Sequence, residues 1–270
     1  MITMESLLDE AEKMKLPLNK KRAILREYIQ SLTLNYIFKS EYGKKLFFAG
    51  GTALRFVYNI PRFSQDLDFN AKGLGYGEFS GMIVLLKDKL DNEGFNVEYT
   101  RKDIYDVLSA KITFKEVMKQ FGLTDKIGLD IMIKIETNVP KWKIKHEVVA
   151  VSKFGQLFTA QIMDKGSFLA EKSHAFIHRC RGRDVYDIIF LLKNKFPLDP
   201  EMFKNKEIQG EPKEALLKKF KGLKKANMKS LVNQVMPFLF KEEEIEYVKK
   251  AVFYGPELLK QYDTSTQKNG

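Results

Sequence analysis

The stretch LFFAGGTALRFVYNIPRFSQDLDFN, residues 46–70, decides the fold that this sequence predicts. A short apolar strand leads into a Gly-Gly-Thr turn, a helix begins at the glycines, and a second strand carries Asp66 and Asp68. Because alternate residues of an extended segment point to the same face, these two carboxylates leave the strand together. Carboxylates held so close repel each other unless a cation or a proton lies between them.

The Gly-Gly-Thr turn has the features of a phosphate site. Gly50 and Gly51 permit a backbone turn that no side chain obstructs, and Thr52 is expected to cap the helix that follows. Free N–H groups at the start of that helix attract anions. Mg²⁺ prefers oxygen ligands, and two such ions about 4 Å apart can clamp the oxygens of a phosphoryl transfer. Each motif alone also occurs as an ordinary turn or a solvated strand end, but together they predict a site for a triphosphate and its metal ions.

A third acidic residue from another strand is expected to complete the metal site. In the alternating segment GLDIMIKIE, residues 128–136, both Asp130 and Glu136 lie on the polar face. They are about 20 Å apart along an extended strand, so only one of them can take part. The sequence leaves both open and favours Glu136, because it ends the strand, where a cleft would open.

The segment LAEKSHAFIHRCRGRDVYDIIFLL, residues 169–192, predicts a helical hairpin with a second group of charged residues. Lys172 and Arg179 lie near one face of its first helix. Asp184 and Asp187 share a face at the start of the second helix, where the helix dipole favours negative charge. A merely solvated hairpin is a poor explanation, because both aspartates lie directly before the apolar run IIFLL, which must be buried.

Other candidate ligands in this region are interpreted as structural. His174 and His178 have the four-residue helical spacing of a zinc site, but no third ligand is evident, and we interpret them as helix-surface residues. The single cysteine, Cys180, excludes an internal disulfide and a cysteine-rich zinc cluster. A reducing cytoplasm is therefore the expected compartment.

The periodicity of the whole chain predicts an α+β fold in two parts. Helical spacing covers residues 5–40, and strand patterns then dominate up to residue 136. The strand signals fade near residue 155, and helical patterns follow. We therefore expect an α/β domain over residues 1–155 and a helical domain over residues 156–270.

The charge of the chain favours a polyanionic partner. Its 270 residues include 46 lysines and arginines against 35 acidic residues, a formal net charge of +11. Such residues bind phosphate backbones without regard to sequence. No apolar run approaches the roughly 18–20 residues that span a bilayer, and no signal peptide is recognised, so no membrane partner is expected. The densest basic cluster, residues 216–229, contains Lys218, Lys219, Lys221, Lys224 and Lys225.

These motifs resemble those of a known family. The segment FFAGGTALRFVYNIPRFSQDLDF looks like the signature of the AbiEii/MenT-type nucleotidyltransferase toxins, with Arg62 and Ser64 forming its Arg-x-Ser. The hairpin over residues 169–192 is similar to the second motif of the family, a Lys, a downstream Arg, then Arg-Asp with a further Asp. The resemblance implies a DNA polymerase β-like nucleotidyltransferase core with a mixed sheet, followed by a helical domain.

The resemblance also implies roles for individual residues. Asp66 and Asp68 would hold two Mg²⁺ ions, with Glu136 as the favoured third ligand. Lys172 would bind the triphosphate, and Asp184 would be a catalytic carboxylate. The nucleotide-binding residues would be Gly50, Gly51, Thr52, Arg62 and Ser64.

The function implied by the resemblance is a Mg²⁺-dependent transfer of a nucleotide from an NTP to RNA, with tRNA as the expected acceptor and pyrophosphate as the product. Such toxins are paired with a cognate antitoxin, and the setting would be a toxin–antitoxin or phage-defence system. Two alternatives stay open. One is a small-molecule nucleotidyltransferase of antibiotic-modifying type, for which an acidic pocket is expected. The other is a non-catalytic nucleic-acid-binding protein with the same fold.

Overall fold

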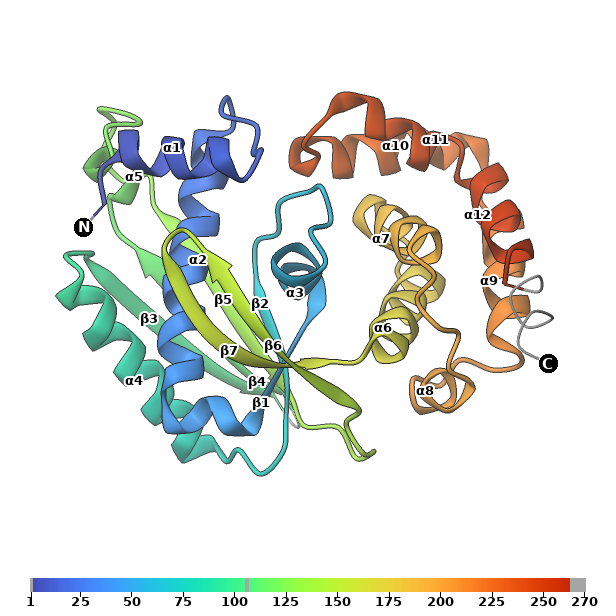
Figure 1. Ribbon diagram of the computed structural model, residues 1–270, viewed down its shortest axis with the longest axis horizontal. Coiled ribbons are helices and arrows are strands. Elements are labelled where there is room, and N and C mark those ends of the chain that lie inside the picture. Colours follow the sequence, from blue (N-terminus) through green and yellow to red (C-terminus); the bar gives the residue numbers. More distant parts are fainter. Residues whose placement is uncertain (1, 105–106, 263–270) are drawn as a thin grey trace. The chain divides into compact units, whose positions relative to one another are not determined.

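The computed structural model describes residues 2–104 and 107–262, which form two compact units (Figure 1). The first unit contains the chain up to Asn59 and again Phe63–Met163. The second contains Ile60–Arg62 and the described residues from Asp164 onward. The segment Ile60–Arg62, which follows the Gly-Gly-Thr helix closely in the sequence, therefore belongs to the helical unit.

A mixed sheet forms the centre of the first unit. Its strands are β1 (Leu46–Ala49), β2 (Leu67–Ala71), β3 (Val97–Ile104), β4 (Val107–Phe114), β5 (Ile131–Asn138), β6 (His146–Lys153) and β7 (Gln156–Met163). The order across the sheet is β3-β4-β5-β2-β1-β7-β6. Strand β2 is antiparallel to β1 and parallel to β5, and β7 is parallel to β1. This combination confirms the predicted α+β class with a mixed sheet.

Helices bury one face of this sheet. The helical elements of the first unit are α1 (Met4–Lys13), α2 (Lys21–Lys39), η1 (Glu41–Lys45), α3 (Gly50–Val57), α4 (Tyr76–Asn92) and α5 (Val117–Gln120). Helix α2 packs on β7 and on α4, while α4 packs on β3 and β4 (Figure 1). The buried face of α2 includes a charged residue. This residue is Glu27, which is buried and pairs with buried Arg55 at 3.1 Å.

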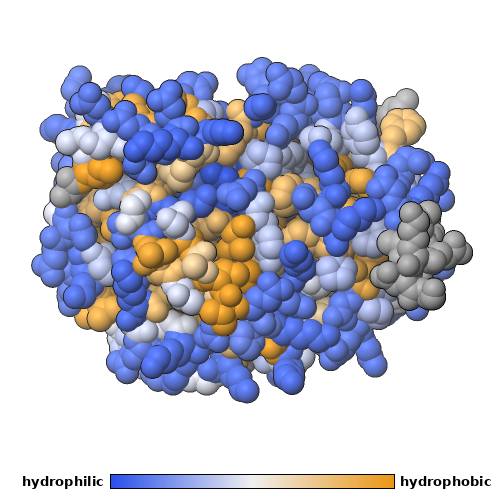
Figure 2. Space-filling view, in the orientation of Figure 1, coloured by the Kyte–Doolittle hydropathy of each residue, from blue (hydrophilic) through white to orange (hydrophobic). Residues whose placement is uncertain are grey.

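The hairpin of β6 and β7 was not expected from the sequence. Strand β6 lies at the edge of the sheet, and of its residues only Val151 is buried. Its charged and exposed residues hide the alternation that marks a half-buried strand. Val148 and Leu157 are 64% and 63% exposed, and Figure 2 shows hydrophobic atoms gathered over this hairpin. Because β7 pairs with β1, the first unit continues to Met163, and the division into functional domains at residue 155 stays a prediction.

The second unit is helical in its described part, in agreement with the expected order of elements. It contains α6 (Lys165–His178), α7 (Gly182–Lys193), α8 (Pro200–Asn205), α9 (Pro212–Lys221), α10 (Lys225–Val235), η2 (Met236–Phe238), η3 (Glu242–Glu244), α11 (Ile245–Lys249) and α12 (Ala251–Lys260). Helix α7 is central, since it packs on α6, α10, α11 and α12. Its apolar run IIFLL is buried almost throughout, as the sequence required.

None of the helices in the described ranges is long and apolar enough to cross a membrane.

The close approach of α7 to α10 leads to a prediction about Gly182. A Cβ atom at this position would lie 1.9 Å from the carbonyl oxygen of Leu231, a backbone atom that cannot swing aside. We expect Gly182→Ala to lower the free energy of unfolding by about 1–3 kcal/mol, the usual cost of overpacking. The measurement is urea unfolding followed by circular dichroism.

Gly77 provides the matched control. It is exposed near the start of α4, and a Cβ there meets no atom within 4 Å. Gly77→Ala is therefore expected to leave stability unchanged or to raise it by up to about 1 kcal/mol. Equal stability of the two variants would refute the close packing of α7 on α10.

Candidate functional site

The acidic pair lies on the central strand of the first unit. Asp66 directly precedes β2 and Asp68 is its second residue, and both are partly exposed while Leu67 between them is fully buried. This alternation is the one expected for two carboxylates on a common face. Asp68 lies opposite Ala49 of β1 and opposite Glu136 of β5. The register therefore places the acid of β2 between the Gly-Gly-Thr turn and the acid of β5.

Gly50 is in direct contact with this carboxylate. Its φ is +70°, in the left-handed region, and a Cβ built on it would lie 2.0 Å from Oδ2 of Asp68. Glycine is therefore required at this position for two reasons, the backbone conformation and the space for Asp68. The glycine turn and the acidic pair form one local structure.

The expected capping role of Thr52 is wrong. The N-cap of α3 is Ala49, and no side chain caps this helix. Thr52 is fully buried, and its hydroxyl donates a hydrogen bond to the backbone oxygen of Asp66. The hydroxyl thus ties α3 to the acidic segment, and anion binding by the N–H groups of the first helical turn stays a prediction.

Helix α2 holds the same segment from another direction. Gln30 donates from Nε2 to the carbonyl oxygen of Ser64 at 3.3 Å. Burial and Arg22 lower the pKa of Arg26, and the carboxylate of Asp66 opposes this shift, so this arginine lies within electrostatic range of the acidic pair. Sequence reasoning missed Arg26 and Gln30, because nothing in the pattern of α2 indicates which of its polar residues face another segment.

The register distinguishes the two candidates for a third acid. Glu136 is the partner of Asp68 across β2 and β5, and its carboxylate pairs with Lys134 at 2.7 Å. Asp130 precedes β5 and accepts hydrogen bonds from Lys115 Nζ at 2.6 Å and from the N–H of Glu116 at 2.8 Å. The hydrogen bond from Lys115 holds the pKa of Asp130 below its ordinary value. Asp130 is therefore engaged with the residues that follow β4, and Glu136 is the acid opposite Asp68 in the sheet.

A divalent cation fits this donor set in part. Asp66 and Asp68 supply carboxylate oxygens, the ligand type that Mg²⁺ prefers, and Gly50 leaves room for the carboxylate of Asp68. Within residues 2–104 and 107–262, however, no group of three or more His, Cys, Asp or Glu side chains is arranged to hold a metal ion. One carboxylate oxygen of Glu136 is in contact with Lys134, and this contact would compete with a cation for the side chain.

The second unit contains a buried network of three charged residues. Asp187 accepts from Arg62 Nε at 2.6 Å and from Arg62 Nη2 at 2.7 Å, a bidentate pair. Lys172 Nζ lies 3.3 Å from the same carboxylate. Arg62 and Asp187 are 2% and 1% exposed, and Lys172 is 9% exposed. Asp187, which the resemblance did not single out for a role, thus joins two of the predicted site residues.

Asp184 has different partners. It is the N3 residue of α7 and accepts from the N–H of Arg181 at 2.8 Å. Arg179 donates to its two oxygens at 3.0 and 2.6 Å. Of the predicted site residues, Lys172 and Arg62 are therefore brought together by Asp187, while Asp184 caps its own helix. Lys172 and Asp184 belong to the second unit and the acidic pair to the first, so their proposed cooperation stays a prediction.

The histidine pair lies on α6 with its two rings close together. The rings of His174 and His178 are tilted by 39° with their centroids 4.4 Å apart, and burial lowers the pKa of His174. Burial also raises the pKa of the Cys180 thiol, as expected for an unreactive side chain.

The lysine cluster over residues 216–229 is divided between two helices rather than carried by one. Helix α9 ends at Lys221, and α10 begins at Lys225, whose side chain lies outside the described residues. Lys218 and Lys224 are exposed, as is Lys221, but Lys219 Nζ donates to the carbonyl oxygen of Ile177 at 2.6 Å. Lys219 therefore stabilises the C-terminal end of α6 by binding one of its last carbonyl groups.

The buried network predicts a large effect of Asp187→Asn. The substitution leaves Arg62 buried without its countercharge, which costs about 3–5 kcal/mol. Glu246→Gln is the control, because Glu246 pairs with Lys249 and Lys250 at the surface, where ion pairs contribute little, so stability should stay close to that of the wild type. Denaturant unfolding measures both, and equal stabilities would contradict a stabilising role of the network.

The same network predicts a dependence on pH. Burial raises the pKa of Asp187, but Arg62 and Lys172 outweigh it, so the pKa lies below the ordinary value. The pair then stabilises the fold above a pH of about 4, and the stabilisation is lost as the pH falls further. We expect the stability difference between the wild type and Asp187→Asn to be constant from pH 7 to 5 and to shrink below about pH 4. A difference that does not change with pH would refute the lowered pKa.

Comparisons with known proteins give a family for the chain and solved structures of similar fold. A family model described as the nucleotidyl transferase AbiEii toxin of type IV toxin–antitoxin systems matches residues 33–254. Among solved structures, JHP933 from Helicobacter pylori is similar with 17% identity and a TM-score of 0.55, covering 92% of this chain and 97% of that one. The nucleotidyltransferase toxin MenT4 from Mycobacterium tuberculosis is similar with 16% identity and a TM-score of 0.56, covering 99% and 93%. No curated protein matches in sequence.

The family model spans the glycine turn, the acidic pair, the mixed sheet and the helical hairpin. The structural likenesses, at this level of identity, independently support the fold. The resemblance inferred from the motifs is thereby confirmed: the chain belongs to the AbiEii family of nucleotidyltransferase toxins, and it is a nucleotidyltransferase.

Proposed function

We propose that this enzyme transfers a nucleoside monophosphate from an NTP to a hydroxyl of RNA, with tRNA as the acceptor and Mg²⁺ as the cofactor. The observation that carries the proposal is the position of Asp68, which lies against Gly50 on one side and opposite Glu136 on the other. A carboxylate in this position can reach both a metal ion and the phosphates bound at the start of α3.

The reaction forms one bond and breaks one. The acceptor oxygen attacks the α-phosphorus, the bond from this phosphorus to the β-phosphate oxygen breaks, and pyrophosphate leaves with the electron pair. The acceptor proton passes to a carboxylate of the acidic pair or to water. Asp66 and Asp68 would hold Mg²⁺, with Glu136 as the third ligand, and the ion would neutralise phosphate charge.

The remaining predicted residues divide between binding and positioning. Gly50, Gly51 and Thr52 offer backbone N–H groups to the triphosphate. Lys172 supplies positive charge to the phosphates, and Asp187 and Arg62 hold it in place. Ser64 acts through its backbone bond to α2, and Asp184 acts by fixing the start of α7.

An RNA acceptor is favoured by the charge of the chain. A net charge of +11 suits a polyanion and would repel the cationic drugs on which antibiotic-modifying relatives act. A binding protein without activity would not need the close fit of Gly50 to Asp68. We propose that the enzyme acts in the cytoplasm, that a cognate antitoxin controls it, and that its setting is a toxin–antitoxin or phage-defence system.

The direct test incubates the protein with each α-labelled NTP, Mg²⁺ and total RNA. We expect label to appear in one class of RNA, with tRNA as the predicted class, and an equal amount of pyrophosphate to be released. Labelling of a small molecule or a protein instead would refute the RNA acceptor. The absence of label from all four NTPs would refute the proposed reaction.

Two glycine variants test the geometry around Asp68. Gly50→Ala places a Cβ against the carboxylate, and we expect it to reduce transfer at least a hundredfold, as Asp66→Ala should. Gly73→Ala is the matched control, since Gly73 has a similar φ of +68° but no atom within 4 Å of an added Cβ. The control introduces the same backbone strain without a contact to Asp68. Full activity in Gly50→Ala, or an equal loss of activity in both variants, would contradict the proposed contact.

The role of Lys172 is tested by Lys172→Ala. Removing a charge that stabilises the transition state typically costs a hundredfold or more in kcat, and we expect a loss on that scale. Asp187→Asn should lower kcat as well, because Lys172 then loses the carboxylate that positions it. Unchanged kcat in a folded Lys172→Ala variant would remove this lysine from the mechanism.

A further inference from the structure

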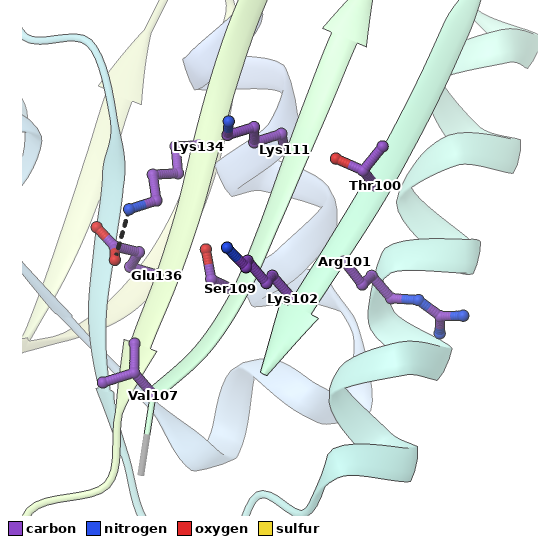
Figure 3. Close-up of a pocket in the computed structure, with 8 residues that line it drawn as sticks. All are labelled: Thr100, Arg101, Lys102, Val107, Ser109, Lys111, Lys134 and Glu136. Atoms are coloured by element: carbon purple, nitrogen blue, oxygen red, sulfur yellow. Dashed lines mark ion pairs between the residues drawn. The ribbon is translucent and has the colours of Figure 1, made fainter. Parts of the chain in front are cut away.

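The polar face of β3, β4 and β5 contains a hollow of about 700 Å³. Its lining includes Thr100, Lys102, Ser109, Lys111, Lys134 and Glu136, and Figure 3 shows these side chains over the three strands. Three of these six are lysines, Arg101 also lines the hollow, and the one carboxylate is already paired with Lys134. The lining therefore carries a net positive charge.

Strand register connects this hollow to the acidic pair. One row of partners runs from Asp68 to Glu136, then to Ser109 and Lys102. In the next row, Lys134 lies opposite Lys111, which lies opposite Thr100. Strands are about 4.8 Å apart, so the lysines of β4 and β3 lie about 10 to 14 Å from β2.

The arrangement of these lysines lowers the stability of the protein when no anion is bound. Like charges directly opposite each other on neighbouring strands are destabilising, and Lys111 faces Lys134 in this way. Among the residues that the structure describes, neither Lys102 nor Lys111 has a hydrogen bond or an ion pair, and both are exposed. An anion with several charges would remove the repulsion.

We propose that this hollow, lined by Lys102, Lys111 and Lys134, binds the phosphodiester backbone of the acceptor strand near its reacting end. The proposal rests on the nucleotidyl transfer proposed above and assigns its acceptor subsite. It adds to the lysines of α9 a phosphate site within the first unit, on β3, β4 and β5, of which β5 carries Glu136.

The direction of the reaction supports the acceptor over the NTP as the occupant. In phosphoryl transfer the attacking and leaving oxygens are roughly in line across the phosphorus. The turn at Gly50, where the triphosphate is proposed to bind, follows β1, whereas the hollow lies beyond β5 on the opposite side of β2. A strand that attacks from the side opposite to pyrophosphate therefore runs over β5, β4 and β3.

The test measures RNA binding without chemistry. The probe is a fluorescein-labelled single-stranded RNA of 12 nucleotides with a free 3′ hydroxyl, titrated with the full chain at 50 to 200 mM KCl without NTP or Mg²⁺. Each lost phosphate contact reduces the log–log salt slope by about 0.7. The double variant Lys102→Gln, Lys111→Gln should therefore lower the slope by about 1.4 and weaken binding roughly tenfold or more at 0.1 M salt.

The matched control removes the same charge elsewhere on the first unit. Lys89 on α4 and Lys39 at the end of α2 are both exposed, and neither lines the hollow. Lys89→Gln with Lys39→Gln should leave the slope and the affinity close to those of the wild type. If both double variants behave alike, only net charge matters, and the proposal is overturned.

A second titration distinguishes the acceptor from the nucleotide. Binding of an α,β-methylene NTP analogue with Mg²⁺ should be unchanged in the lysine double variant. A loss of analogue affinity would assign the hollow to the triphosphate and overturn the proposal. Failure of the wild type to transfer any nucleotide would refute the proposed reaction alone, because RNA binding through these lysines is measured independently of it.

Discussion

The pairing of β2 with β1 on one side and β5 on the other is the constraint on which the site depends. Antiparallel pairing with β1 returns the chain so that Asp68 lies against the glycine turn that follows β1. Parallel pairing with β5 places Glu136 in the same row. A slip of one residue in either register would turn Asp68 into the core and Leu67 or Phe69 towards solvent. Hydrophobic burial of β2 therefore fixes the position of the acidic residues.

In the second unit, charge is buried where apolar packing would be less costly. The pair of Arg62 and Asp187 is almost fully inaccessible, and such pairs contribute little net stability compared with apolar residues of similar size. What this pair does provide is a fixed carboxylate beside Lys172. Arg62 also belongs to the segment Ile60–Arg62. In the sequence this segment interrupts the sheet unit, but it is part of the helical unit. The ion pair thus anchors that segment four residues before Asp66 in the sequence.

Local patterns in the sequence predicted local structure well. The alternation around Asp66 and Asp68, the helix beginning at the glycines and the helical hairpin of α6 and α7 all depend on neighbouring residues. The errors involve partners that are distant in the chain. Thr52 bonds to a carbonyl rather than capping α3, and Asp187 binds Arg62, which lies 125 residues earlier in the chain. The edge strand β6 was not predicted, because both of its faces are largely exposed and the alternation of apolar and polar residues is therefore weak. Strand order and register are set by packing of the whole sheet, which no short segment encodes.

The central claim is that Asp66 and Asp68 hold the divalent cation of a nucleotidyl transfer. The most direct measurement is the binding of Mn²⁺, followed by electron paramagnetic resonance in the presence of an α,β-methylene NTP analogue. The account predicts that the wild type binds Mn²⁺ and that Asp68→Asn loses this binding while it remains folded, whereas Asp130→Asn retains it. Equal Mn²⁺ binding by the wild type and Asp68→Asn would contradict the account.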